Sequence, residues 1–412
     1  MKNISKINYQ KFILSKRINY KKYRNTKKIL YKIIDNLDKP QSFFHSLSRK
    51  FSYNFNLKDF KKYKKFKNIV LIGMGGSVIG SEAIYKFLQE KIKKNFIFLN
   101  NIDETKLKKI KKENKTNNTL FIIISKSGST VETITNFLAL KIIKKRSKNI
   151  LIITEKNNNL LHSLAKKMEL PIIEHKHYIG GRFSVLSEVG MLPAFLMGLS
   201  IKRIRNNLLI PLKNSNINFL IKNIIKLSTL LENRKINNLV FCNFIPELDG
   251  FLSWSQQLIA ESLGKNGKGF LPTISTAPKD HHSLLQLYLD GPKDKLFYIF
   301  SFSKNKKTSY KLNPRIFDKK FDFLKKKNIS QIKIAQKKAF LTILKKKKIP
   351  FRELVIKDKT EETIGELLSL FMIEIAIVGK TININPFNQP AVEELKVVTK
   401  KILTSKNTKN NF

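Results

Sequence analysis

Short apolar runs of strand-forming residues recur along this chain, and a helical pattern follows each run. The first four runs lie at 69–72, 96–99, 120–124 and 150–153. Helical patterns at 82–91 and 131–143 lie between them. Apolar strands that alternate with helices are typical of a parallel sheet, because a helix must carry the chain back across the sheet before the next strand starts. The sequence therefore predicts an α/β fold.

The same alternation returns in the second half of the chain. Strands are predicted at 239–244, 296–302 and 354–357, and helices at 253–263, 283–289 and 364–378. A helix-rich stretch at 187–231 separates the two halves. We therefore expect four parts, which are an N-terminal helical region at 1–60, two α/β domains at 61–205 and 206–385, and a C-terminal helix with its tail at 386–412.

The charge of the chain is strongly positive, with 80 Lys and Arg against 30 Asp and Glu. Such a balance first suggests a nucleic acid or an acidic membrane as the partner. The lysines are spread along the whole chain, however, and runs such as 61–67 and 345–348 are typical of solvated loops and helix faces. No stretch of about 20 apolar residues could span a bilayer. The interpretation is a soluble, cytoplasmic protein that binds neither nucleic acid nor membrane.

Cysteine and histidine usage gives no indication of a metal site. Cys242 is the only cysteine, so an internal disulfide and a cysteine-based metal site are excluded. It stands in an apolar run that predicts a buried strand. The histidines show no spacing typical of metal ligands. We therefore expect chemistry carried by side chains alone.

A glycine-rich loop, Gly-Met-Gly-Gly-Ser at 73–77, directly follows a predicted strand and begins a helix. Glycines let the backbone approach a ligand closely, and the free N–H groups at the start of a helix suit an anion. A dinucleotide-binding loop would need glycine at position 78, where Val78 stands. The loop therefore predicts phosphate binding, and the alternative is an ordinary glycine turn.

A second loop, Ser-Lys-Ser-Gly-Ser-Thr at 125–130, also joins a predicted strand to a helix. Its four hydroxyls can donate to phosphate oxygens, whereas a helix N-cap would need only one of them. Two such loops after strands of one parallel sheet meet at the edge where α/β folds bind ligands. The predicted phosphate ligands are Gly76, Ser77, Ser125, Lys126, Ser127, Gly128, Ser129 and Thr130.

Three further segments carry candidate reactive side chains. Gln257 and Glu261 stand one helical turn apart, so they share a helix face. Arg182 follows two glycines in Gly-Gly-Arg-Phe-Ser at 180–184. Gln389 and Lys396 stand seven residues, or two helical turns, apart in the segment 383–396, so they are also expected to share a helix face. The plainer alternatives are a surface glutamate, an arginine in a structural ion pair, and an anchored helix that carries a lysine.

Taken together, the segments 125–130, 180–184 and 383–396 resemble the phosphoglucose isomerase family of the sugar isomerase (SIS) domain superfamily. The resemblance runs from about residue 67 to residue 403. It implies two flavodoxin-like domains with mainly parallel sheets flanked by helices. It also implies interconversion of glucose 6-phosphate and fructose 6-phosphate through an enediol, without cofactor or metal.

The resemblance also implies a role for each reactive side chain. Glu261 would move a proton between C1 and C2 of the sugar, and Arg182 would stabilise the enediolate. His282 and Lys396 would open the sugar ring. His282 is preferred over His281 because the family's histidine has Gln four residues and Gly nine residues further on. In the family this histidine comes from the neighbouring subunit, which implies a homodimer, and Gln257 and Gln389 would bind the substrate.

Three other functions remain open on the sequence. A related isomerase could accept further phosphosugars, such as mannose 6-phosphate. A phosphosugar-binding regulator could use the same domains without catalysis, but it would need a DNA-binding domain that residues 1–60 do not clearly offer. A nucleic-acid-binding protein is motivated by the charge alone and predicts strongly salt-dependent retention on DNA.

Overall fold

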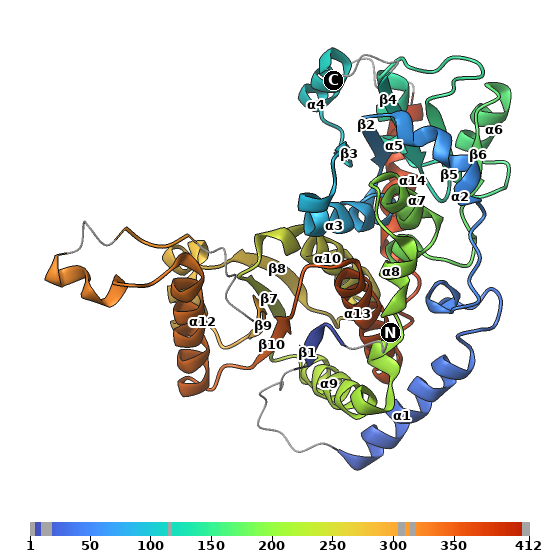
Figure 1. The fold of residues 1–412 in the computed structure, drawn as a ribbon. Helices are drawn as coiled ribbons and strands as arrows, with labels where there is room; N and C mark the ends of the chain where they lie inside the picture. The colour runs from blue at the N-terminus through green and yellow to red at the C-terminus, as the bar shows by residue number, and fades with distance from the viewer. Residues whose placement is uncertain (1–4, 10–18, 114–117, 304–309, 314–317, 406–412) are drawn as a thin grey trace.

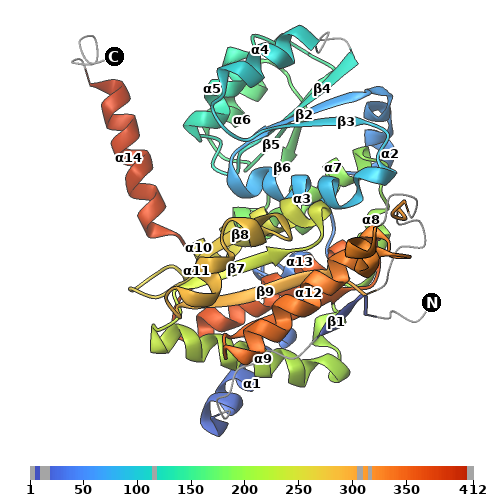
Figure 2. The ribbon, with the colours of Figure 1, turned by 90° about the vertical axis from the view of Figure 1, so that its left-hand side faces the viewer.

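The computed structural model describes residues 5–9, 19–113, 118–303, 310–313 and 318–405. The first sheet has the strand order β3-β2-β4-β5-β6, with all four pairings parallel (Figures 1 and 2). Its strands are β2 (Asn68–Gly73), β3 (Asn95–Leu99), β4 (Thr119–Ile124), β5 (Ile150–Thr154) and β6 (Ile172–Glu174). Its helices are α3 (Ile79–Leu88), α4 (Glu104–Glu113), α5 (Val131–Ala139) and α6 (Leu160–Lys167). The four strands predicted in this half are confirmed, and β6 is additional.

The second sheet has the order β1-β10-β9-β7-β8, in which only β1 runs antiparallel to its neighbour. Its strands are β1 (Ile7–Tyr9), β7 (Asn238–Asn243), β8 (Leu271–Thr276), β9 (Lys295–Phe302) and β10 (Phe351–Ile356). Its helices are α9 (Asn214–Asn233), α10 (Asp249–Leu263), α11 (Leu285–Asp290), α12 (Ile329–Lys346) and α13 (Glu361–Thr381). The three predicted strands of this half are confirmed, and the mainly parallel α/β architecture is confirmed with them.

Shorter elements connect these layers. The N-terminal region contains α1 (Tyr20–Asp35), η1 (His45–Leu47), α2 (Leu57–Phe60) and η2 (Lys61–Lys65), where η denotes a 3₁₀ helix. Other connections are η3 (Gly75–Ser77), η4 (Gln89–Lys91), η6 (Gly181–Leu186), α7 (Glu188–Leu196), α8 (Ile201–Asn206), η7 (Ile210–Leu212), η8 (Pro246–Leu248), η9 (Lys279–His282) and η11 (Lys319–Leu324). The last helix of the described residues is α14 (Pro390–Thr404), which agrees with the predicted C-terminal helix. Of the predicted tail, residues 406–412 lie outside the described residues.

The two halves are joined by the packing of α3 against α10. Gly250 in α10 makes this approach possible, since a methyl group on it would lie 3.0 Å from Ala83 Cα and 3.1 Å from the Glu82 carbonyl oxygen. One continuous apolar core contains Leu71 of the first sheet and Phe241 of the second. The halves therefore share a core and position the loops of the first sheet over α10.

Helix α13 is buried along almost its whole length, although its sequence contains four glutamates, one of them in its apolar second half. Glu374 is fully buried, and it pairs with the equally enclosed Arg352 at 2.6 Å. A buried carboxylate requires such a partner, because its desolvation would otherwise cost several kcal/mol. In the part of the chain that the structure describes, no helix is long and apolar enough to cross a membrane.

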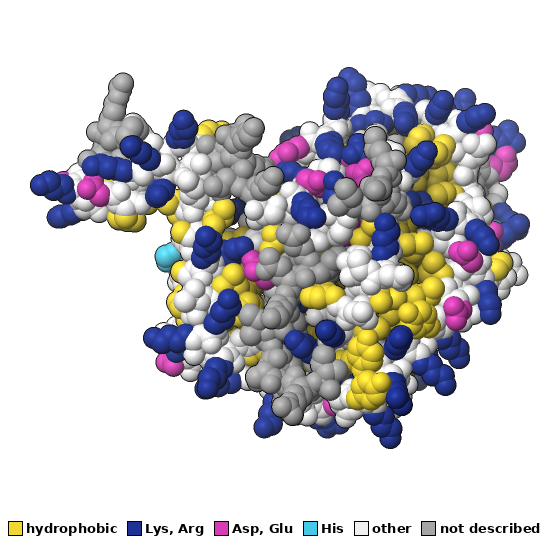
Figure 3. Space-filling model, turned by 60° about the horizontal axis from the view of Figure 1, so that its bottom comes forward, with side chains coloured by type: hydrophobic (Ala, Val, Ile, Leu, Met, Phe, Trp, Pro, Cys, Tyr) yellow, Lys and Arg dark blue, Asp and Glu magenta, His cyan; other side chains and the backbone are white. Residues whose placement is uncertain are grey.

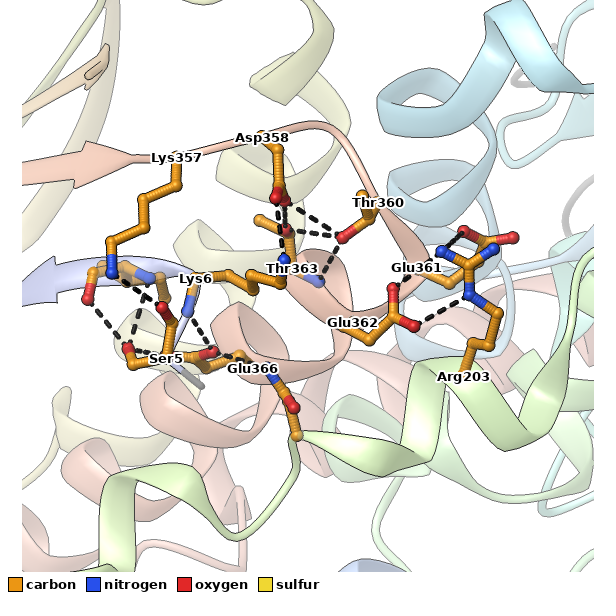
Figure 4. A network of polar contacts seen from close by, with 12 residues as sticks. Ser5, Lys6, Arg203, Lys357, Asp358, Thr360, Glu361, Glu362, Thr363 and Glu366 are labelled. Carbon is orange, nitrogen blue, oxygen red and sulfur yellow. Dashed lines mark hydrogen bonds and ion pairs between the residues drawn. The ribbon is translucent and has the colours of Figure 1, made fainter. Parts of the chain in front are cut away.

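The N-terminal strand is fastened to α13 by a polar network (Figure 4). Glu366 accepts hydrogen bonds from Ser5 Oγ at 2.5 Å and from the Lys6 amide at 2.8 Å. Lys6 Nζ lies 2.9 Å from Asp358, which also accepts a hydrogen bond from Thr363. The sequence analysis expected the N-terminal region to be helical. Besides its helices, this region also supplies β1 to the second sheet.

Basic side chains are widely spread on the part of the surface that Figure 3 draws. Figure 3 shows Lys and Arg scattered over one whole face, with few acidic side chains between them. This distribution agrees with the spread of lysines along the sequence, and it does not form a single basic stripe on that face.

Candidate active site

The two predicted phosphate-binding loops lie at the same edge of the first sheet. Strands β2 and β4 are parallel neighbours, and Gly73 pairs with Ile124 at their carboxyl ends. The strand that follows β2 in sequence lies on the other side of β2, so the chain reverses its winding direction here. Such a switch point is where open α/β sheets bind ligands.

The first loop is forced to be glycine-rich by its neighbours. Gly75 has φ of +50°, which is strained for other residues. A methyl group on Gly76 would lie 2.2 Å from the carbonyl carbon of Gly181 and 2.5 Å from the amide nitrogen of Arg182. The first loop thus lies directly against the segment that carries Arg182. Ser77 ends η3 and is half-buried beside this contact.

The second loop presents its hydroxyls in two pairs. Ser125 is buried, and its Oγ lies 3.1 Å from Thr130 Oγ1. Ser127 and Ser129 are exposed, and their Oγ atoms lie 3.3 Å apart. Gly128 has φ of +61° and turns the loop between the pairs. Each pair can donate to an oxygen of a bound anion by a rotation of its hydroxyl groups.

The side chain of Lys126 in the second loop is directed to other partners than these hydroxyls. Lys126 Nζ donates to the carbonyl oxygen of His177 at 2.7 Å and lies 3.6 Å from Glu155. Burial, together with the charge of Lys126, lowers the pKa of His175 to about 4. The imidazole beneath this loop is therefore neutral near pH 7.

Arg182 connects three segments that are distant in sequence. Its Nη1 donates to Glu261 Oε2 at 3.0 Å and to Gln389 Oε1 at 2.8 Å. Its Nε donates to Ser262 Oγ at 2.9 Å, and its Nη2 donates to the Pro386 carbonyl oxygen. The residue is only 2% exposed. Burial lowers the pKa of Arg182, while the negative charge of Glu261 raises it.

Gln257 completes the surroundings of Glu261. Its Nε2 donates to Glu261 Oε1 at 2.9 Å, so the predicted shared helix face is observed in α10. The same amide lies over the first loop, 2.6 Å from where a methyl group on Gly75 would stand. Gln257 Oε1 is buried and has no hydrogen-bond partner among the described residues. It can therefore accept a hydrogen bond from a bound hydroxyl.

The two adjacent histidines lie in different environments. The ring of His281 packs 5.2 Å from Phe340 and 5.8 Å from Phe244, between ring centroids. Burial lowers the pKa of His281, and repulsion from His282 lowers it further. His282 is exposed, and no contact between described residues joins it to Arg182 or Glu261. Of the two rings, His282 is the one that a neighbouring molecule can reach.

Lys396 lies on a helix that leaves the body of the molecule (Figure 2). Its Nζ pairs with Glu393 of the same helix at 2.7 Å, and no residue of α14 is buried. Gln389 is the N-cap residue and has non-helical backbone angles. The sequence analysis expected both side chains on one helix face. Because Gln389 lies outside the regular helix, the spacing of seven residues does not place them so. Gln389 points to Arg182, whereas the role of Lys396 stays a prediction.

The structure adds residues that the sequence analysis did not select. Trp254 donates through Nε1 to the carbonyl oxygen of Arg182 at 3.1 Å. Ser262 Oγ accepts a hydrogen bond from Arg182 Nε. Lys265 donates to the Asn385 carbonyl oxygen at 2.7 Å. Burial lowers the pKa of Lys265 to about 8, and the charge of Arg182 acts in the same direction. Of these residues, only Ser262 could have been selected from the sequence, because it directly follows Glu261.

The arrangement combines an edge rich in glycines and hydroxyls with a carboxylate that is held between an amide and a guanidinium. The carboxylate can accept and return a proton, and the guanidinium can stabilise a negative charge that develops beside it. Among the described residues, no group of three His, Cys, Asp or Glu side chains could hold a metal ion. The two sheets and this edge together define an α/β protein of two halves with mainly parallel sheets and a polar site between them.

Comparison with known proteins gives the family. The family model described as phosphoglucose isomerase matches residues 24–207. A glucose-6-phosphate isomerase of Methanocaldococcus jannaschii is 34% identical over 356 residues, which cover 84% of this chain and 86% of that protein. One of Carboxydothermus hydrogenoformans is 30% identical over 82% of this chain and 79% of that protein. The chain belongs to the phosphoglucose isomerase family.

Solved structures agree with the fold. A glucose-6-phosphate isomerase of Chlamydia trachomatis has a TM-score of 0.74 at 18% identity, over 94% of this chain and 87% of that chain. A hypothetical protein of Thermus thermophilus has a TM-score of 0.75 at 23% identity, over 94% of this chain and all of the other. At these identities the likeness concerns the fold alone.

Proposed function

We propose that this protein interconverts D-glucose 6-phosphate and D-fructose 6-phosphate through a cis-enediol. The observation that carries the proposal is the pairing of Arg182 with Glu261 at 3.0 Å, beside two loops rich in hydroxyls and glycines. The family relatives that match most of the chain are named for this reaction. The two loops would bind the phosphate, and the carboxylate would act on the sugar.

In the proposed mechanism Glu261 removes the proton from C2 of the open-chain aldose and returns it to C1. Its two oxygens are oriented by Gln257 and Arg182, so the carboxylate does not need to be ordered when the substrate binds. Arg182 stabilises the negative oxygen of the enediolate because its guanidinium is buried and already in place before the substrate binds. Lys396 and His282 would serve the ring-opening step.

Substrate binding is proposed to start at the phosphate. The donors would be the backbone at Gly76 and Gly128 together with the hydroxyls of Ser77, Ser125, Ser127, Ser129 and Thr130, assisted by the charge of Lys126. Gln257 and Gln389 would then contact the sugar. Domains at 61–205 and 206–385 form part of the same proposal, with the phosphate loops on the first and Glu261 on the second.

The direct test is Glu261→Gln, which keeps the shape and removes the base. We expect kcat to fall by about a thousandfold or more, with a much smaller change in KM. Activity of the unsubstituted protein should survive a chelator. Glu104→Gln is the matched control, because the Glu104 side chain is 83% exposed and far from any role in the site. A Glu261→Gln protein as active as this control would refute the assignment.

The same assay separates the alternatives. Turnover of mannose 6-phosphate at a comparable kcat/KM would favour a phosphosugar isomerase of broader specificity. A folded protein that binds 6-phosphogluconate but turns over none of these sugars would indicate a phosphosugar-binding regulator. In that case the residues of the second half would have no catalytic role.

We also propose a homodimer that completes each site. Helix α14 has no buried residue, and its apolar side chains lie in solvent. They are Val392, Leu395, Val397, Val398, Ile402 and Leu403, all at least 40% exposed. An apolar helix face of this size is stabilised when a second surface covers it. A second copy of the chain is the proposed cover, and it would bring His282 to the neighbouring site.

Coexpression of two inactive variants tests the shared site. If His282 comes from the partner, a dimer of one Glu261→Gln and one His282→Ala subunit contains one intact site. Random pairing should then restore about a quarter of the activity, because half of the dimers are mixed and one of their two sites works. If His282 acts within its own subunit, coexpression restores nothing. Each variant expressed alone is the control.

A further inference from the structure

A second cavity lies apart from the Arg182–Glu261 cluster, between the segment that follows η1 and the region of α8 and η7. Its volume is about 380 Å³. Four cationic side chains line it, which are Arg49, Lys202, Arg205 and Lys213, and no acidic side chain is among its lining residues. Leu47 and Leu209 give it an apolar wall. The cavity is within the usual size range of small-molecule sites.

Arg205 is held in this cavity by neutral partners only. Its Nη1 donates to the Ser46 carbonyl oxygen at 2.8 Å, to Tyr53 Oη at 3.2 Å and to the Leu186 carbonyl oxygen at 3.4 Å. Its Nη2 donates to the Ser48 carbonyl oxygen. Burial raises the pKa of Tyr53 to about 12, so this phenol supplies no negative charge near pH 7. The charge of the half-buried guanidinium is therefore not neutralised by its hydrogen bonds.

The cations Arg49 and Lys202 resemble Arg205 in that no carboxylate in the described part of the chain neutralises them. Within the described residues, Arg49, Lys202 and Arg205 have no carboxylate within 4.0 Å. The acid that acts on the same phenol is Glu188, which is buried and pairs with Lys176 at 3.4 Å. Three cations thus line the cavity without a carboxylate partner.

A neighbouring arginine on the same helix shows the contrast. Arg203 lies next to Lys202 on α8, yet its guanidinium pairs with Glu362 at 2.8 Å and with Glu361 at 3.4 Å. The absence of carboxylates around the cavity is therefore not a general property of this helix. A partly desolvated guanidinium without a counter-charge is a costly arrangement that an anionic ligand would relieve.

We propose that this cavity binds a small organic phosphate that carries at least two negative charges. Guanidinium and ammonium groups are the side chains best suited to phosphate oxygens. The apolar wall formed by Leu47 and Leu209 would receive the uncharged part of the ligand. The site is distinct from the hydroxyl-rich loops at the edge of the first sheet, and the proposal does not depend on the isomerase activity.

The cavity is connected to the candidate active site through one short element. Arg205 donates to the carbonyl oxygen of Leu186, which is the last residue of η6, and Arg182 is the second residue of the same 3₁₀ helix. A ligand that draws the Arg205 guanidinium toward the cavity would act on the end of the segment that positions Arg182. This connection gives the second site a physical route to the first.

Calorimetric titration with inorganic pyrophosphate, at low ionic strength, tests the proposal. The variant Arg49→Gln/Lys202→Gln removes two exposed charges from the cavity, and Lys39→Gln/Lys222→Gln removes two exposed charges elsewhere. We expect a binding event, separate from any at the hydroxyl-rich loops, that weakens about tenfold or more in the first variant and stays within about twofold in the control. Equal weakening in both variants, or in neither, would overturn the proposal.

Two further measurements keep the result interpretable. Dimethyl phosphate carries a single charge, so it should bind at least about tenfold more weakly than pyrophosphate, and equal affinity would overturn the charge requirement. Thermal unfolding should show that the double variant is folded. If it is not, Lys202→Gln alone, which changes one exposed side chain on α8, must give a selective weakening of the same event for the proposal to stand.

Discussion

Arg182 is enclosed by protein, yet its guanidinium donates hydrogen bonds to oxygen atoms of five other residues around the site. A buried guanidinium is tolerable only under this condition, because removal of one partner leaves an uncompensated charge at a cost of about 3–5 kcal/mol. The same arrangement that stabilises the fold therefore orients Glu261. At the scale of single residues, stability and the proposed catalysis rest on the same contacts.

His175 provides a prediction on acid sensitivity. Its pKa is lowered from 6.5 to about 4 by burial and by the charge of Lys126. Between these two values the unfolded chain binds a proton that the folded chain does not, so stability falls as the pH falls through this window. We expect the protonation of His175 in the unfolded chain to lower the free energy of unfolding by about 2 kcal/mol at pH 5 relative to pH 7.

Urea unfolding at pH 7 and pH 5 measures this effect. His175→Gln should lose less stability between the two pH values than the unsubstituted protein does. His177→Gln is the control, because that ring is exposed and its removal should leave the pH dependence unchanged. A His175→Gln protein with the pH dependence of the unsubstituted chain would contradict the prediction.

At the scale of elements, the site depends on the close approach of η3 and η6. The first belongs to the glycine-rich loop after β2, and the second carries Arg182. Their backbones meet where Gly76 and Gly181 face each other. The packing of α3 on α10 then places Glu261 and Gln257 next to this contact between η3 and η6. Three elements from two halves of the chain thus converge on one carboxylate.

Two glycines at this contact should respond very differently to alanine. A methyl group on Gly76 would lie 2.3 Å from the Gly181 carbonyl oxygen, whereas a methyl group on Gly181 meets nothing within 4 Å. We expect Gly76→Ala to destabilise the protein by about 3 kcal/mol and to abolish most activity, because backbone must move. Gly181→Ala should change the stability by less than about 1 kcal/mol. Similar urea midpoints for the two variants would show that the contact is not as close as described.

At the scale of the whole molecule, one continuous core joins the two sheets beneath a strongly basic surface. The formal net charge is +50. A charge of this size opposes the compact state through self-repulsion, and added salt screens it. The network around Glu366 also has a global role, since it ties the start of the chain to α13.

Salt should therefore stabilise this protein against heat. Raising sodium chloride from about 20 to about 300 mM shortens the screening length to well below 10 Å, so we expect the Tm to rise by several degrees. Scanning calorimetry measures the shift, and sorbitol at equal osmolality is the control for general solvent effects. A Tm that stays constant or falls with salt would mean that local ion pairs outweigh the net charge.

Local patterns in the sequence were sufficient for most of the parallel strands. Runs such as those at 69–72 and 120–124 are apolar on both faces, which is the signature of a strand covered by helices on both sides. The two predicted phosphate loops follow these strands directly, so their common edge was predictable because the carboxyl ends of parallel strands lie at one edge of a sheet. Gln257 and Glu261 share a face because the helix period alone sets their spacing.

The remaining features depend on contacts between distant segments. Strand β1 has three residues, and β8 contains Pro272 and an exposed Leu271, so neither has a strong local pattern. The pairing of Arg182 with Glu261 and Gln389 joins positions up to 207 residues apart.

The sequence by itself thus determined the α/β class, because it follows from patterns within single strands and helices. It also predicted a phosphate-binding edge from two loops, and the resemblance to a known family supplied the candidate reactive residues. Only the tertiary structure decided which of those residues meet. It set Arg182 against Glu261 and turned Lys126 to a carbonyl oxygen. It also left Lys396 on an exposed helix. The physical reason is that burial and ion pairing are properties of surfaces brought together by folding, and no local pattern contains them.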